Sequence, residues 1–328
     1  MKAAWYERKG PAAEVLQVGD YPDPSPGPGE VRVRLSYSGV NPGDIKKREG
    51  WLGFPMPYPR IIPHSDGAGV IDAIGPGVDP ARRGQRVWVY GAQSYRPFGT
   101  AAEFTVVPDT LAVDLPTQVS DQLGATLGIP GITAHRAVFA DGSVQGRTLL
   151  VQGVRGGVSA IAAVLAAWGG ATVIGTVRRA TELDRIDRSV VRYPIALDQS
   201  NAGARIRAAT PDGVDRIIEV DLAGNADLDV EVVRQDTVIA VYASSDERPQ
   251  IPFWPLLFAN VTLRLLGSDD FPAEAKQQAA RDLSVVAAEG RLSIRIAPPY
   301  SLEEIAQAHE AVEAGARNGR VVIAVQPR

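Results

Sequence analysis

The sequence contains no cysteine and only three histidines among its 328 residues. The lack of cysteine excludes disulfide bonds, cysteine nucleophiles and thiolate zinc sites. His64, His135 and His309 are far apart in the chain, and none has the spacing that is typical of metal ligands. We therefore expect a protein that binds no zinc and whose chemistry depends on neither a thiol nor a histidine cluster.

The sequence also lacks long uncharged apolar runs and an excess of positive charge. No window approaches the length needed to cross a bilayer, and the N-terminal MKAAWYERKG has no apolar signal core. The net charge of −4 gives no electrostatic reason to expect nucleic acid or an acidic membrane as a partner. We expect a soluble cytoplasmic protein, and the length of the chain predicts two domains.

Residues 147–179, RTLLVQGVRGGVSAIAAVLAAWGGATVIGTVRR, have the order strand, glycine turn, helix, strand. In this context a glycine turn binds dinucleotides, because glycines let the backbone approach a pyrophosphate and the helix N-terminus offers N–H groups to its charge. We therefore predict that the cofactor contacts the turn residues, which are Gly153, Val154, Arg155, Gly156, Gly157 and Val158.

The glycine pattern differs from the usual G-x-G-x-x-G fingerprint. It reads Gly153-x-x-Gly156-x-x-Ser159, so a small serine stands where the last glycine is expected. Glycine-rich turns also occur for purely structural reasons, and this alternative stays open.

The residues that follow the second strand predict which dinucleotide binds. An NAD site would have an acid there to hold the ribose 2′-hydroxyl. This chain has Thr176, Val177, Arg178 and Arg179, with no acid before Glu182. Because a guanidinium binds phosphate oxygens in pairs, we predict that Arg178, with Arg179, contacts the 2′-phosphate of NADPH. The alternative is a solvated arginine pair in a loop.

The rest of the chain predicts a β-rich region followed by alternating strands and helices. Short strands with Gly/Pro turns are expected at 1–6, 31–38, 61–70, 85–90 and 100–108, and they indicate a small, partly open barrel. Further strands are expected at 190–197, 214–219, 237–242 and 261–267, with short helices near 202–209 and at 231–235 and a helix break at Pro130 and Gly131. This alternation is typical of a doubly wound parallel sheet. The C-terminal elements, which end in a strand at 321–325, could return to the first domain.

Several segments occur together in the order and spacing of one known family. They are SGVNPGDIKKREG, IPHSDGAGVI, GQRVWVY, GTAAEF, GIPGITAH, LLVQGVRGGVS and GRVVIAV. Over nearly its whole length the chain resembles the zinc-free quinone oxidoreductases of the zeta-crystallin type, in the medium-chain dehydrogenase/reductase superfamily. The resemblance implies a GroES-like β-barrel catalytic (substrate) domain over residues 1–120 and 268–328, and a Rossmann NADPH-binding domain with a doubly wound parallel sheet over residues 121–267.

The resemblance also implies site residues. Zinc-containing relatives have a cysteine at the position of Asn41 and a histidine at that of Ser65, so it agrees with a site without metal. It implies that Asn41 and Thr133 lie near the nicotinamide, as candidate catalytic residues, and that Tyr193 lies near the 2′-phosphate. The rest of the cofactor cleft is implied to be lined by Tyr242, Ala243, Ser244, Leu266, Gly267, Ser268 and Asn318.

The substrate is expected among the aromatic residues of the first domain. The candidates are Lys47, Trp51, Phe54, Tyr58 and Tyr95, and aromatic rings with few polar groups suit flat apolar ligands. The alternative is that the aromatic segment 51–59 is a loop packed on the barrel. Members of the family often have a tyrosine just after the Asn-Pro turn, and this chain has none there.

These residues predict an NADPH-dependent reductase of quinones or similar conjugated carbonyls. The cofactor carries the hydride, and a quinone needs no strong protein acid because its reduced oxygens take protons from solvent. Two alternatives stay open: an enoyl or 2-alkenal reductase, which needs a proton donor, and a non-catalytic NADPH-binding sensor or structural protein. An exposed strand at 261–267 would need a partner, and with the resemblance it predicts a homodimer.

Overall fold

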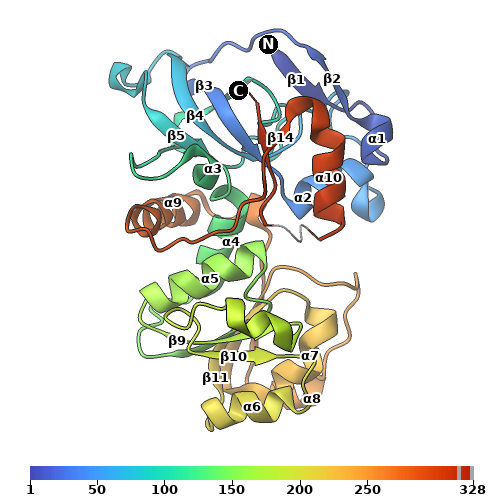
Figure 1. Cartoon of the computed structure of the whole chain (residues 1–328), viewed down its shortest axis with the longest axis vertical. Coiled ribbons are helices and arrows are strands. Elements are labelled where there is room, and N and C mark those ends of the chain that lie inside the picture. The colour runs from blue at the N-terminus through green and yellow to red at the C-terminus, as the bar shows by residue number, and fades with distance from the viewer. Residues whose placement is uncertain (316–318, 326–328) are drawn as a thin grey trace. The chain divides into compact units, whose positions relative to one another are not determined.

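The structure is a computed structural model, and it describes residues 1–315 and 319–325 (Figure 1). The chain divides into two compact units, Met1–Pro130 with Lys276–Arg328, and Gly131–Ala275. The first is built on an antiparallel sheet and the second on a parallel one, which confirms the predicted fold class. The roles predicted for the two domains, catalytic and NADPH-binding, stay predictions.

The sheet of the first unit is organised around β3 (Glu30–Gly39). The strand is long enough to have two neighbours along one edge: its first half pairs with β6 (Phe104–Pro108) and its end with β15 (Val322–Ala324). The strand order is β14-β15-β3-β4-β5-β7, where β4 is Asp66–Ile74, β5 Arg86–Val89, β7 Ala112–Asp114 and β14 Tyr300–Ser301. A separate pair is formed by β1 (Lys2–Trp5) and β2 (Gln17–Asp20).

The C-terminal elements complete this first unit, as expected. β15 pairs with β3, and α10 (Ile305–Glu313) packs against α1 (Ala12–Val15) and α2 (Pro42–Glu49). Ser301 and Glu304 form a capping box, which satisfies two backbone donors at the start of this helical segment.

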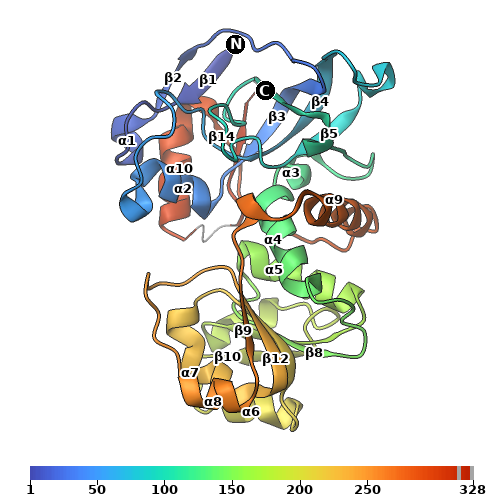
Figure 2. The ribbon, with the colours of Figure 1, turned by 180° about the vertical axis from the view of Figure 1, so that it is seen from behind.

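The second unit contains six parallel strands in the order β10-β9-β8-β11-β12-β13. Figure 2 labels β8, β9, β10 and β12 of this sheet. Their bounds are β8 Thr148–Val151, β9 Thr172–Val177, β10 Tyr193–Ala196, β11 Val214–Glu219, β12 Val233–Val241 and β13 Thr262–Leu265. The helices are α5 (Gly157–Trp168), α6 (Ala202–Ala209), α7 (Leu222–Val232) and α8 (Phe253–Phe258). The order reverses between β8 and β11, and ligands of doubly wound sheets bind beyond the carboxyl ends of the strands at such a point.

Two predicted elements were wrong. Pro130 and Gly131 do not break a helix, because α4 (Gly128–Phe139) begins at Gly128 after α3 (Asp121–Gly124) and runs through them. Pro130 therefore lies in the first turn, where its missing N–H leaves no intrahelical bond unmade. The short helix expected at 231–235 is instead the end of α7, and β12 begins directly after it. The remaining helix, α9 (Ala273–Ala288), directly follows Pro272.

The start of α4 makes a close contact that a single methyl group would destroy. A Cβ added at Gly128 would lie 2.0 Å from Asp66 Oδ1, so we expect Gly128→Ala to destabilise the protein by about 1–3 kcal/mol. Gly43→Ala is the matched control, because a Cβ there meets nothing within 4 Å and alanine gains up to about 1 kcal/mol of helix propensity. Urea unfolding measures both, and equal midpoints for the two variants would contradict the contact.

Candidate functional site

The predicted glycine turn lies between β8 and α5 and is anchored to β9. Gly153 has a φ of +63°, which glycine adopts without strain. Its N–H donates to Thr176 Oγ1 (2.8 Å), and the N–H of Val154 donates to the Thr176 carbonyl (2.9 Å). The N-cap of α5 is Gly156, which has no side chain to cap the first turn. Its N–H groups can therefore bind an anion such as a phosphate.

Ser159, which replaces the last glycine of the fingerprint, is accommodated by hydrogen bonds. Its buried hydroxyl donates to the Gln152 carbonyl (2.6 Å) and lies 2.7 Å from Tyr242 Oη. Close packing comes instead from Gly175, where an added Cβ would lie 2.5 Å from Val154 Cγ1. The serine is therefore compatible with this turn, because its hydroxyl is hydrogen-bonded and Gly175 provides the close packing.

Charged side chains surround the outer side of this turn. Arg178 and Arg179 are exposed and follow the end of β9. Arg155 forms an ion pair with Glu182, whose other oxygen accepts from the Arg179 N–H (3.1 Å). Glu182, the first acid after β9, therefore contacts both the turn and the arginine segment. The sequence analysis gave Glu182 no role in the site. Its position three residues after Arg179 was the only feature of the sequence that could have indicated the contact.

The other predicted cofactor residues of this unit are more scattered. Tyr193 begins β10 at the edge of the sheet, and the Arg192 guanidinium lies 5.4 Å from its ring centre. Tyr242, Ala243 and Ser244 follow β12, and the Ser159 contact brings Tyr242 to the turn. Leu266, Gly267 and Ser268 follow β13, and Thr133 is buried in α4. Asn318 lies outside the described residues.

In the first unit, Asn41 is buried and both ends of its side-chain amide are engaged. Nδ2 donates to Asp66 Oδ2 (2.7 Å), and Oδ1 accepts from Arg320 Nη2. The Asn41 N–H donates to Asp44 Oδ2 (2.8 Å), which closes a capping box at the start of α2. These partners fix the orientation of the amide, and the sequence analysis identified neither Asp66 nor Arg320.

Asp66 also holds the beginning of α4. The Ile129 N–H lies 2.9 Å from each of its carboxylate oxygens. Burial, together with the charge of Asp44, raises the pKa of Asp66 to about 7, against the hydrogen bonds from Ile129 and Asn41 and the charge of Arg320. The buried carboxyl can therefore exchange a proton near neutral pH.

The predicted substrate residues do not form one cluster. Trp51 and Phe54 are exposed, and the Lys46 ammonium, rather than Lys47, lies over the Trp51 ring (4.5 Å). Tyr58 Oη donates to the Tyr95 carbonyl (2.6 Å), which joins two candidates. Tyr58 also packs against a small core cluster of Tyr6, Val15 and Ile61, so at this residue the packed-loop alternative has support.

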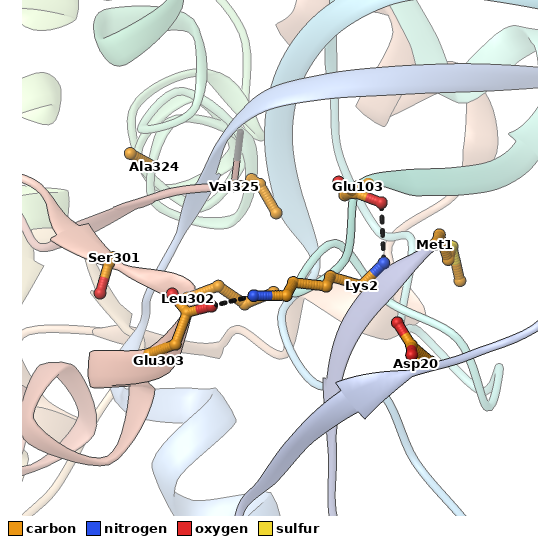
Figure 3. Close-up of a pocket in the computed structure, with 9 residues that line it drawn as sticks. All are labelled: Met1, Lys2, Asp20, Glu103, Ser301, Leu302, Glu303, Ala324 and Val325. Atoms are coloured by element: carbon orange, nitrogen blue, oxygen red, sulfur yellow. Dashed lines mark hydrogen bonds and ion pairs between the residues drawn. The ribbon is translucent and has the colours of Figure 1, made fainter. Parts of the chain in front are cut away.

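A cavity of about 430 Å³ lies elsewhere in the first unit (Figure 3). It is lined by Met1, Lys2, Asp20, Glu103, Ser301, Leu302, Glu303, Ala324 and Val325. Lys2 reaches across it, pairing with Glu303 through Nζ (2.6 Å) and with Glu103 through its backbone N–H (2.7 Å). None of the predicted site residues lines this cavity, so we assign it no part in the candidate site.

Two histidines meet in the interior of the first unit. His64 Nε2 and His309 Nε2 are 2.9 Å apart, and Ser38 Oγ lies 2.8 Å from His64 Nδ1. Burial lowers the pKa of His64 to about 3 and that of His309 well below its usual value, so both rings are neutral.

In residues 1–315 and 319–325 no group of three or more His, Asp or Glu could hold a metal ion. No helix in the same ranges is long and apolar enough to cross a membrane.

The raised pKa of Asp66 predicts a pH-dependent stability. A carboxyl with a raised pKa in the folded state stabilises the fold at low pH, and this contribution is lost as the pH rises from about 4 towards 7. We expect Asp66→Asn to flatten the fall in the free energy of unfolding over this range, by up to about 1.4 kcal/mol per pH unit. The exposed Asp212→Asn is the control, and urea unfolding at a series of pH values is the measurement. An unchanged slope in Asp66→Asn would refute the assignment.

Comparisons with known proteins agree with this architecture. Residues 27–117 match the alcohol dehydrogenase GroES-like domain family, and residues 190–323 match the zinc-binding dehydrogenase family. The chain is 28% identical to a quinone oxidoreductase of Rattus norvegicus over 323 residues, 97% of this chain and 95% of that protein.

Solved structures show the same fold. A mycobacterial quinone oxidoreductase matches with a TM-score of 0.84 and 25% identity, over 99% of this chain and 100% of that one. A mycobacterial structure in complex with NADPH matches with the same values. The two domain matches and the similarity along nearly the whole length agree with the two-domain architecture of the medium-chain dehydrogenase/reductase superfamily, and the full-length relatives to which the chain is similar are quinone oxidoreductases.

Proposed function

We propose that this oxidoreductase uses NADPH to reduce a quinone or a similar conjugated carbonyl, without zinc. The observation that carries the proposal is the uncapped N-terminus of α5 at the glycine turn, with the exposed Arg178 and Arg179 at the end of the neighbouring strand. The N-terminus of α5 can bind an anion such as a phosphate. The residues that follow β9 are arginines and not an acid, and guanidinium groups suit a dinucleotide that has a 2′-phosphate. A cytoplasmic location stays a prediction.

In this proposal the protein binds and orients, and the bound cofactor supplies the hydride. The turn residues bind the pyrophosphate, and Arg178 binds the 2′-phosphate, with Arg179 beside it. Asn41 contacts the nicotinamide end, and its amide is held in place by Asp66 and Arg320. Such preorganisation matters because a small misplacement of the reacting groups costs much of the rate.

The acceptor is proposed to meet the nicotinamide beside the aromatic residues of the first unit. Lys47, Trp51, Phe54, Tyr58 and Tyr95 remain the candidates. Reduction of a C=C bond needs a proton delivered to carbon, whereas quinone oxygens take protons from water. NADPH oxidation measured with 1,4-benzoquinone and with an enone separates the two reactions. Binding of NADPH without turnover on either acceptor would favour the non-catalytic alternative.

The arginines predict a preference for NADPH over NADH. We expect Arg178→Ala to weaken NADPH binding about tenfold and to leave NADH binding unchanged, because only NADPH has a phosphate for the guanidinium to bind. The exposed Arg188→Ala is the control and should bind both cofactors as the wild type does. Fluorescence titration of the three proteins with the two cofactors gives the six dissociation constants. Equal affinity of the wild type for NADPH and NADH would contradict the 2′-phosphate contact.

We also propose that the protein is a homodimer that joins along β13. In the described part of the second unit this strand pairs with β12 alone, which leaves one edge open. Leu265 on β13 is 73% exposed, and four more large apolar side chains are exposed on the preceding helix α8. They are Phe253, Trp254, Leu257 and Phe258. An open edge with exposed apolar side chains suits burial against a second copy.

A charged side chain on the open edge of β13 should prevent the dimer from forming. We expect wild-type protein at micromolar concentration to sediment as a dimer and Leu265→Lys as a monomer, since lysine would have to lose its hydration in the interface. Val285→Lys is the control, because Val285 is an exposed apolar residue on α9. A wild-type protein that sediments as a monomer would refute the proposal.

A further inference from the structure

Two buried carboxyl groups lie beneath the glycine turn, where the order of the parallel strands reverses. Glu219 is the last residue of β11, and Asp229 lies on α7. Both are completely buried. Gln152, also buried, follows β8 and leads directly into the turn at Gly153. Buried acids are costly unless they are paired or protonated, so this pair requires a physical explanation.

Hydrogen bonds connect Asp229 to the turn in an unbroken chain. Asp229 Oδ1 accepts from Gln152 Nε2 (3.0 Å), and Gln152 Oε1 accepts from the Thr176 hydroxyl (2.7 Å). Thr176 Oγ1 in turn accepts from the Gly153 N–H (2.8 Å). The Gly153 N–H can only donate, and the Thr176 hydroxyl that accepts this bond donates its own proton to Gln152 Oε1.

The burial of both acids favours a single proton for the pair. Glu219 Oε1 already accepts from the Asp221 N–H and from Asn225 Nδ2 (2.8 Å). The remaining oxygens, Glu219 Oε2 and Asp229 Oδ2, are buried and have no hydrogen-bond partner among the described residues. The charge of Glu219 raises the pKa of Asp229, and a proton between the two carboxyl groups would satisfy both free oxygens.

The surroundings of the two groups favour the proton on Asp229 and the negative charge on Glu219. Glu219 receives two N–H donors that stabilise its charge, whereas Asp229 receives one neutral amide. Burial, and then the charge of Glu219, raise the pKa of Asp229 well above its usual value. Burial also raises the pKa of Glu219, against its hydrogen bonds. The other titratable groups near the pair are Asp221, whose charge opposes a second ionisation, and the neutral Tyr242 hydroxyl.

We propose that Asp229 is a positioning residue for the dinucleotide, and that the proton it shares with Glu219 holds the glycine turn in its binding conformation. The inference rests on the proposed cofactor site but concerns residues that the cofactor does not touch. Loss of the shared proton would place two negative charges side by side in the core, and Asp229 would move away from Glu219. Gln152 would then release Thr176, and the Gly153 N–H would lose its fixed acceptor.

The first test needs no cofactor. In the free protein we expect the Gly153 amide to exchange slowly with solvent in the wild type and in Asp229→Asn, and quickly in Asp229→Ala. Asparagine can still accept from Gln152 and donate to Glu219, so it keeps the contacts without a titrating proton. Asp227→Ala is the matched control, since Asp227 is exposed on the same helix. Slow Gly153 exchange in Asp229→Ala would overturn the inference.

The second test measures NADPH binding by fluorescence. We expect Asp229→Ala to raise the dissociation constant about tenfold or more, and Asp229→Asn and Asp227→Ala to leave it within about twofold at neutral pH. In the wild type the affinity should fall as the pH rises and Asp229 ionises, whereas in Asp229→Asn it should not. A parallel pH dependence in the two proteins would overturn the role of the proton.

The two tests separate this inference from the proposed function. If NADPH binds the wild type and Asp229→Ala equally, the inference fails and the function survives. If NADPH does not bind the wild type but Gly153 exchange responds to Asp229→Ala, the proposed function fails and the link from the acids to the turn stands. Should Asp229→Ala not fold, Thr176→Val breaks the same chain with a side chain of similar shape, and slow Gly153 exchange there would equally overturn the inference.

Discussion

The candidate cofactor site depends on the attachment of one turn to the strand beside it. Gly153 and Val154 both donate backbone hydrogen bonds to Thr176, so the turn between β8 and α5 is held by β9 as well as by its own ends. Glycine at position 153 permits the left-handed backbone that brings both N–H groups to one residue. With the turn fixed in this way, α5 starts without a side-chain cap and its N–H groups are available to a phosphate.

The buried polar groups of each unit support its candidate site residues in the same manner. In the second unit, Ser159 donates to the carbonyl of Gln152, which directly precedes the turn, and the Gln152 side chain accepts from Thr176, which holds the turn. In the first unit, Asp66 binds the Asn41 amide and the first turn of α4 together. In both places a carboxyl with a raised pKa lies one or two hydrogen bonds from a residue with a proposed role. Such groups cost stability unless they are fully satisfied, and they specify one arrangement when they are.

Local patterns were enough to predict much of the fold. The strand, glycine turn and helix of residues 147–179 are encoded by neighbouring residues, and the structure has them at the expected positions. The prediction failed where the position of a residue within its helix determined the outcome. A proline breaks the interior of a helix but is tolerated in the first turn, and only the helix start at Gly128 shows that Pro130 lies in the first turn. Helix α7 was missed because polar residues interrupt its apolar face, including the buried Asp229.

The supporting residues of the site could not be predicted, because their contacts join distant parts of the chain. Arg320 binds Asn41 across 279 positions, and Asp229 binds Gln152 across 77. No periodicity or short motif reports such a pair. Glu219 had a weak signal, as an acid at the end of a strand that was predicted to be buried, and Asp66 had a comparable one within HSDG.

Hydrogen–deuterium exchange with and without NADPH is the most direct test of the central claim, that the turn and the end of β9 bind this cofactor. The account predicts that NADPH slows exchange in the segments that contain Gly153–Val158 and Thr176–Arg179, and that NADH does so less in the second segment. Unchanged exchange in the turn at saturating NADPH, or protection confined to other segments, would contradict it.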